Sequence, residues 1–134
     1  MTTLLAETLM VRSTDDIVNV RQRVRNVAII SGFNLVDQTK IITAASELAR
    51  NTVIYGGGGV LKIEVLNNGT RSGVKLTFED EGPGIANVEL ALKDGYTTGS
   101  GLGMGLGGAR RLSNEFQIES TPGKGTRGAI TKWK

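Results

Sequence analysis

The chain has 134 residues, enough for one domain with a hydrophobic core, and its 16 basic and 13 acidic side chains leave a formal net charge of +3. It contains no cysteine or histidine, which excludes disulfides, zinc held by cysteine or histidine, and a Ser-His-Asp triad. Aromatic residues make up only 4% of the chain, which argues against a surface that stacks nucleic-acid bases. With no apolar run of membrane-spanning length and no signal-peptide pattern, we expect a cytoplasmic protein that binds neither nucleic acid nor membrane.

The first half of the sequence predicts one strand and two helices. A loose alternation favours a strand from Leu4 to Arg12, and Ser13 then marks the start of a helix that ends at Gly32. Asn34 can cap a second helix, whose pattern ends near Tyr55 before a run of glycines. The buried stripe of this second helix is predicted to be Ile41, Ala44, Ala45, Leu48 and Thr52.

The second half predicts a hairpin, two short helices and two more strands. In chain order, the expected elements are a strand over Leu61–Val65, a strand over Val74–Phe78, a short helix over Asn87–Lys93, a helix from Leu106, a strand over Phe116–Ser120 and a strand over Thr126–Trp133. We therefore expect an α/β fold with a mixed or mostly antiparallel sheet and helices packed on one face. Strict βαβ repetition is absent, which disfavours a Rossmann fold.

A glycine-rich stretch runs from Gly95 to Gly108 and leads into the helix expected at Leu106. A flexible linker would be glycine and serine throughout, whereas Leu102, Met104 and Leu106 alternate with the glycines and require burial. A glycine loop before a helix N-terminus presents unpaired N–H groups and the positive end of the helix dipole, which suit a phosphate.

The common phosphate-binding loops do not fit this stretch. A Walker loop ends in Gly-Lys-Ser/Thr, which is absent, and a dinucleotide-binding loop follows a strand directly, whereas loop residues precede Gly99. A protein-kinase glycine loop is followed by a strand carrying a lysine, but a helix is expected here. The nature of the site therefore depends on the rest of the chain.

Glu47 and Asn51 lie four residues apart on the second helix, so their side chains share one face. One interpretation is an ordinary solvated polar face. The other is functional, because a carboxylate beside an amide oxygen suits a proton acceptor next to a Mg²⁺ ligand.

Asp80 follows the strand predicted over Val74–Phe78 and has the same parity as Val74, Leu76 and Phe78, so it should point to the apolar side of the sheet. A carboxylate buried there needs hydrogen-bond donors, and the exocyclic amine of an adenine would supply one. The alternative is an aspartate that closes a tight turn by accepting a bond from its own backbone. Both interpretations remain open from these residues alone.

Taken together, four segments resemble the N, G1, G2 and G3 boxes of the GHKL ATPase/kinase superfamily, which includes gyrase B, Hsp90, MutL and the catalytic domains of histidine kinases. Histidine kinases usually have asparagine where Glu47 stands, whereas serine kinases of the anti-sigma-factor type have glutamate. The first strand and two helices are also similar to those of the switch serine kinases of the bacterial stressosome. The segments that carry the resemblance to the four boxes are Glu47–Asn51, Asp80–Ile85, Gly101–Leu106 and Gly125–Thr126.

The resemblance implies a Bergerat fold in a single domain over residues 1–134 and a site for ATP with Mg²⁺. Asp80 would bind the adenine amine, Thr126 would assist through water, Asn51 would hold Mg²⁺ and Glu47 would accept the proton of the substrate hydroxyl. The stretch from Gly95 to Leu102 would form a mobile lid. The other residues implied to contact the nucleotide are Gly82, Gly84, Gly101, Leu102, Gly103, Met104, Gly105 and Leu106.

The resemblance also implies an activity and partners: transfer of phosphate to a serine or threonine of STAS-domain stressosome proteins, and activation of a PP2C-type phosphatase by binding it. Two alternatives remain: a nucleotide-dependent binding switch without kinase activity, and a hydrolysing ATPase related to MutL or gyrase. Glu47 favours the kinase, because a pure binding protein has no need of a carboxylate at that position.

Overall fold

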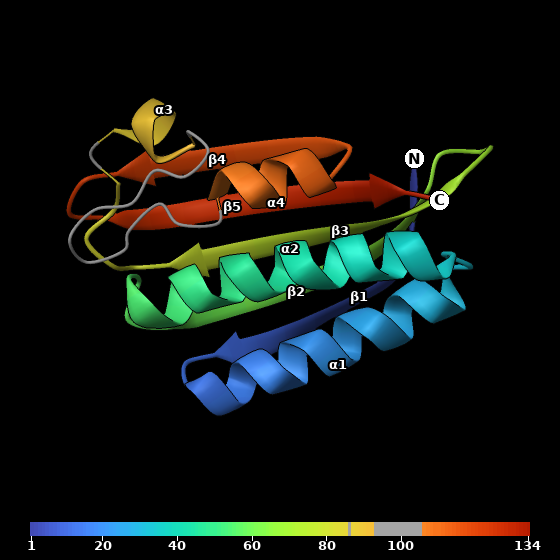
Figure 1. Ribbon diagram of the computed structural model, residues 1–134, viewed down its shortest axis with the longest axis horizontal. Coiled ribbons are helices and arrows are strands. Elements are labelled where there is room, and N and C mark those ends of the chain that lie inside the picture. Colours follow the sequence, from blue (N-terminus) through green and yellow to red (C-terminus); the bar gives the residue numbers. More distant parts are fainter. Residues whose placement is uncertain (86, 93–105) are drawn as a thin grey trace.

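The computed structural model describes residues 1–85, 87–92 and 106–134 (Figure 1). The elements, in chain order, are β1 (Thr2–Val11), α1 (Thr14–Ile30), α2 (Leu35–Ile54), β2 (Gly59–Asn67), β3 (Ser72–Asp80), α3 (Val88–Ala91), α4 (Leu106–Leu112), β4 (Glu115–Thr121) and β5 (Gly125–Trp133). Each element predicted from the sequence is present at the expected place in the chain.

The five strands form one sheet in the order β1-β2-β3-β5-β4. Every neighbouring pair is antiparallel, so the sheet is antiparallel throughout and not mixed. Figure 1 shows α1, α2 and α4 lying over the same face of this sheet. The predicted α/β class with helices on one face is confirmed.

The core lies between this helical layer and the sheet. Alternate residues of the central strands are fully buried, as the two-residue period of a strand requires. The helices contribute residues that recur every three or four positions. The largest fully buried side chains are Ile41, Leu61, Ile63, Leu76, Ile130, Val11, Val20, Val24 and Val74.

Local capping explains where the two long helices begin and end. Ser13 caps α1, and the Asp16 carboxylate accepts backbone N–H bonds from Arg12 and Ser13, which hold the pKa of Asp16 below its ordinary value. At the other end of α1, Gly32 adopts φ 84° and donates to the carbonyl of Ile29 at 3.0 Å. This positive φ stops the helix and turns the chain towards α2.

No helix among the described residues is both long and apolar enough to cross a membrane.

Candidate nucleotide-binding site

A pocket of about 490 Å³, part of it open to solvent, lies between the C-terminal half of α2, the C-terminal end of β3, the N-terminal end of β5 and the start of α4. Its walls are mainly apolar with a few polar groups, the composition typical of a site for a small organic ligand. Five of its lining residues were predicted from the sequence as site residues: Asn51, Asp80, Gly84, Leu106 and Thr126. The others are Leu48, Thr52, Tyr55, Gly56, Phe78, Ile85, Ile118 and Gly128.

Asp80 can be interpreted from the sequence either as an acceptor for an adenine amine or as an aspartate that closes a turn. It lines the pocket beside Phe78, as strand parity predicted, and its Oδ1 also accepts a bond from the Gly82 amide at 3.0 Å. The turn bond is therefore made, and the carboxylate still lines the pocket. A carboxylate has about four acceptor positions, so the turn bond leaves capacity for a ligand amine.

The surroundings of Asp80 act on its pKa in two directions. Burial is the larger influence and raises the pKa, while backbone bonds from Gly82 and Thr126 lower it, and the net direction is upward. A partly buried carboxylate with a raised pKa gains from a hydrogen-bond donor that enters the pocket. The exocyclic amine of adenine is a donor of this kind.

Three glycines around Asp80 allow backbones to approach each other closely. A Cβ at position 82 would lie 2.7 Å from the Cα and carbonyl oxygen of Gly56, and a Cβ at position 56 would fall 2.5 Å from Oδ2 of Asp80. Gly84 combines φ 76° with a position at which a Cβ would overlap the carbonyl oxygen of Thr121. Gly84 lines the pocket, whereas Gly82 sets the spacing between the loops that frame it.

Thr126 belongs to a hydroxyl pair that the sequence analysis did not find. The hydroxyls of Ser120 and Thr126 lie 2.8 Å apart, and Ser120 Oγ also accepts from the Ile85 amide at 2.7 Å. These bonds join the loop after β3 to the β4–β5 hairpin and so hold the wall of the pocket. No local signal marks Ser120, because its bond from Ile85 joins residues 35 positions apart and its pairing with Thr126 depends on the register of the β4–β5 hairpin.

Asn51 and Glu47 occupy successive turns of α2. Asn51 lines the pocket, and its carbonyl accepts from the amides of Tyr55 and Gly56 at 3.0 Å each, where the helix ends. Glu47 is partly exposed and lies one turn before Asn51, outside the residues that line the pocket. This places the carboxylate where a group from solvent can reach it.

The described residues contain no group of three or more Asp, Glu, His or Cys side chains that could hold a metal ion by themselves. Mg²⁺ commonly takes only one or two protein ligands and completes its coordination with phosphates and water. The amide oxygen of Asn51 at the pocket fits that smaller role. The predicted lid and five predicted site residues lie outside the described residues: Gly101, Leu102, Gly103, Met104 and Gly105.

Comparisons with known proteins identify the family of this chain. The family model described as "Histidine kinase-, DNA gyrase B-, and HSP90-like ATPase" matches residues 36–133. The serine/threonine-protein kinase RsbT of Bacillus subtilis is 47% identical over 118 residues, which cover 88% of this chain and 89% of RsbT. An anti-sigma F factor of Thermoanaerobacter is 38% identical over 101 residues, covering 69% of this chain and 68% of that protein.

Two solved structures share the fold. The RsbU and RsbW domains of Rv1364c from Mycobacterium tuberculosis match with a TM-score of 0.66 and 20% identity, over 100% of this chain and 33% of that one. The mycobacterial sensor histidine kinase MprB matches with a TM-score of 0.57 and 15% identity, over 96% of this chain and 97% of that one. The chain therefore belongs to the family of histidine kinase-, DNA gyrase B- and HSP90-like ATPases, the GHKL superfamily.

Proposed function

We propose that residues 1–134 form one ATP-binding domain that transfers the γ-phosphate of ATP to a serine or threonine hydroxyl of another protein. The observation that carries this proposal is the position of Glu47, one helical turn before Asn51 and beside the pocket that Asp80 lines. The 47% identity to a protein named as a serine/threonine kinase supports the same activity.

In the proposed complex, Asp80 accepts a bond from the adenine amine, and the apolar walls exclude water from the faces of the base. Thr126 and Gly84 lie beside the base, and Asn51 would hold Mg²⁺. The bound ion would neutralise charge on the phosphates. The chain itself thus supplies orientation of the nucleotide and a polar anchor at each end of it.

Glu47 acts on the acceptor. Its carboxylate takes the proton of the serine or threonine hydroxyl as the oxygen forms its bond to the γ-phosphorus and the bond from that phosphorus to ADP breaks. A side chain that is partly exposed at the rim of the pocket suits this role, because the acceptor arrives from solvent on a second protein.

The proposed acceptors are STAS-domain proteins of a stressosome, and the proposed downstream partner is a PP2C-type phosphatase that the chain activates by binding. The relatives named RsbT and anti-sigma F factor support a place in bacterial regulatory signalling, and the proposed location of the chain is the cytoplasm. A nucleotide-dependent binding switch without kinase activity is the second candidate. The relatives named as anti-sigma factors favour it, since such proteins act by binding.

Replacing Glu47 tests the proposal. In Glu47→Ala, phosphoryl transfer from radiolabelled ATP to a STAS-domain protein should fall by about 10²–10⁴, the usual contribution of a general base. ATP affinity measured by calorimetry should stay close to that of the wild type, because Glu47 lies outside the pocket lining. Glu119→Ala, which removes an exposed carboxylate on β4, is the matched control and should retain transfer. Near-normal transfer by Glu47→Ala would remove Glu47 from the mechanism, and no transfer by the wild type would favour the binding switch.

A further inference from the structure

One side of α2 carries a row of exposed side chains with the partly exposed Glu47 among them, here called the outer stripe. Its members recur every three or four residues, so they lie within a narrow sector of the helix surface. Ile41, Ala45 and Thr52 are buried on the opposite side. The outer stripe consists of Val36, Lys40, Thr43, Glu47, Arg50 and Ile54.

The outer stripe meets the nucleotide pocket at Glu47. At about 100° of rotation per residue, Glu47 and Asn51 are about 40° apart around the helix. Asn51 lines the pocket, whereas Lys40 and Thr43 continue the row away from it along the helix surface. A protein lying along the outer stripe would therefore reach Glu47 next to the pocket.

The outer stripe carries two cations with one carboxylate between them. Lys40 and Arg50 are exposed cations on either side of Glu47, about 10 Å and 5 Å away along the axis at a rise of 1.5 Å per residue. Neither makes an ion pair with another residue in the described ranges 1–85, 87–92 and 106–134. Acidic groups on a partner would complement both cations and would be repelled by Glu47, which favours an uncharged group between them.

Apolar side chains stand at the two ends of the row. Val36 is 62% exposed and Ile54 is 49% exposed, about 27 Å apart along the helix. A standard protein interface buries about 800 Å² on each partner, a patch about 30 Å across. The outer stripe thus has the length of one such interface, with apolar contacts at its ends and the reacting residue between them.

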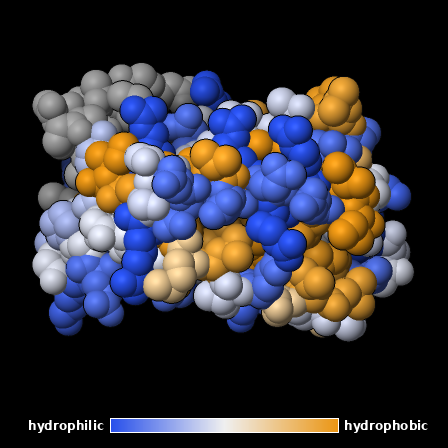
Figure 2. Space-filling view, turned by 90° about the horizontal axis from the view of Figure 1, so that it is seen from below, coloured by the Kyte–Doolittle hydropathy of each residue, from blue (hydrophilic) through white to orange (hydrophobic). Residues whose placement is uncertain are grey.

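The apolar end at Val36 belongs to a larger exposed group at the turn between α1 and α2. Figure 2 shows apolar side chains gathered towards the end of the molecule where α1 leads into α2 in Figure 1. The exposed apolar residues of these two elements near the turn are Ile29, Ile30, Leu35 and Val36. Exposed apolar surface of this kind, next to a charged row, is typical of protein-binding sites.

We infer that the outer stripe is the docking surface for the acceptor protein, and that Lys40 and Arg50 select an acceptor hydroxyl flanked by acidic side chains. This inference rests on the proposed kinase activity, because that activity requires an acceptor hydroxyl at Glu47. The acceptor places an apolar side chain on Val36, acidic side chains against Lys40 and Arg50, and its serine or threonine at Glu47.

Charge reversal at Lys40 tests whether this cation selects an acceptor hydroxyl flanked by acidic side chains. With the STAS-domain protein that the wild type phosphorylates as probe, Lys40→Glu should raise the KM for that protein at least tenfold, with kcat and ATP affinity changed less than twofold. Arg25→Glu makes the same charge change on the exposed face of α1 and should leave the KM near the wild-type value. Lysine substitution of an acidic residue near the acceptor hydroxyl should restore part of the loss in Lys40→Glu. An equal effect of the two reversals, or none from Lys40→Glu, would overturn the selection by charge.

Photo-crosslinking tests the docking surface without requiring transfer. In a Glu47→Gln background with a non-hydrolysable ATP analogue, p-benzoylphenylalanine replacing Thr43 should crosslink to the same STAS-domain protein, and the same group replacing Gln22 on α1 should not. A crosslink joining two copies of this chain, or no preference for Thr43, would overturn the inference. A crosslink from Thr43 combined with no transfer by the wild type would preserve the docking surface and reject the kinase.

Discussion

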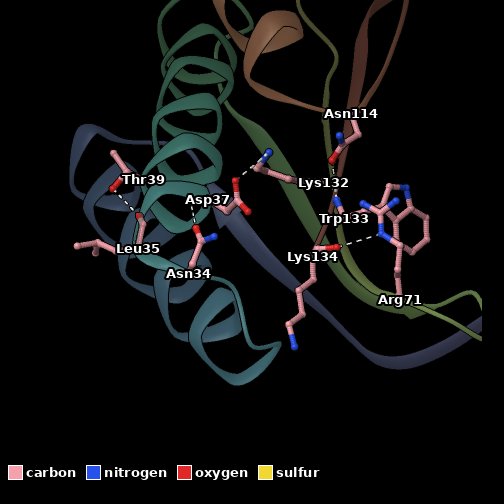
Figure 3. Close-up of polar contacts among 9 residues, drawn as sticks. All are labelled: Asn34, Leu35, Asp37, Thr39, Arg71, Asn114, Lys132, Trp133 and Lys134. Atoms are coloured by element: carbon pink, nitrogen blue, oxygen red, sulfur yellow. Dashed lines mark hydrogen bonds and ion pairs between the residues drawn. The ribbon is translucent and has the colours of Figure 1, made fainter.

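The two ends of α2 are built in opposite ways. At its N-terminal end, side-chain bonds hold the helix: Asn34 accepts from the Asp37 amide at 2.8 Å, and Lys132 of β5 lies 3.5 Å from the Asp37 carboxylate (Figure 3). Lys132 is only 7% exposed, so this ion pair is shielded from solvent. The polar groups of Asn34, Asp37 and Lys132 at this end are paired within the protein.

At the C-terminal end of α2, close packing of backbone segments takes the place of the hydrogen bond and ion pair found at the other end. The loop after α2 approaches the loop after β3 through Gly56 and Gly82, and the carboxylate of Asp80 stands beside them with a raised pKa. The N-terminal end of the helix thus has its capping and ion-pair groups satisfied internally and supports stability. The other end keeps a partly buried acceptor for a ligand and relies on glycines for its shape.

The largest loss of stability should come from a side chain introduced at Gly84, where the backbone lies close to Thr121 at the pocket end of the molecule. Gly84→Ala places a Cβ against the Thr121 carbonyl at φ 76°, and we expect a loss of about 2–5 kcal/mol in the free energy of unfolding from backbone strain and overpacking together. Urea denaturation of the nucleotide-free protein measures it.

Gly123→Ala is the matched control, because Gly123 has φ 81° and no atom within 4 Å of a Cβ built there. It should lose only the cost of the positive φ, about 1–2 kcal/mol. Equal losses in the two variants would show that the contact between Gly84 and Thr121 does not constrain the pocket.

A smaller effect, on ATP affinity, is expected from a substitution of the Asp80 carboxylate. Asp80→Asn keeps an oxygen that can accept from the Gly82 amide but loses the charge that favours an adenine amine. A charge-assisted hydrogen bond contributes about 1.5–3 kcal/mol, so ATP affinity should fall by about one to two decades with the fold retained. Calorimetric titration measures the change, and an unchanged affinity would assign Asp80 to the turn alone.

The same variant tests the raised pKa of Asp80. A carboxylate whose pKa rises on folding favours the native state below its ordinary value of 3.8, and this contribution is lost as pH rises through the folded pKa. The melting temperature of Asp80→Asn relative to the wild type, without nucleotide, should therefore increase from acid to neutral pH. A constant difference across that range would contradict the burial of the Asp80 carboxylate.

The smallest effect is expected at the N-terminal end of α2. Asn34→Ala removes the bond to the Asp37 amide and should lower the free energy of unfolding by about 1 kcal/mol, the usual loss for a helix N-cap. Because the pocket lies at the other end of the helix, ATP affinity should stay unchanged in calorimetry. A weaker affinity in Asn34→Ala would mean that the two ends are coupled.

Features that depend on near neighbours follow from the amino-acid sequence. Asn34 and Gly32 act on residues within four positions, so the helix boundaries follow from local chemistry. The spacing of Glu47 and Asn51 and the parity of Asp80 depend only on helix and strand periods, which is why the face of each side chain was predictable.

The contacts that those side chains make depend on the tertiary structure. The strand order placed Thr126 opposite Asp80, brought Ser120 to Thr126, and paired Lys132 with Asp37. Asp80 and Thr126, like Asp37 and Lys132, are far apart in the chain, whereas Ser120 and Thr126 face each other across the β4–β5 hairpin. All three contacts depend on sheet register and on how closely the elements pack, and neither leaves a periodic signal in the sequence.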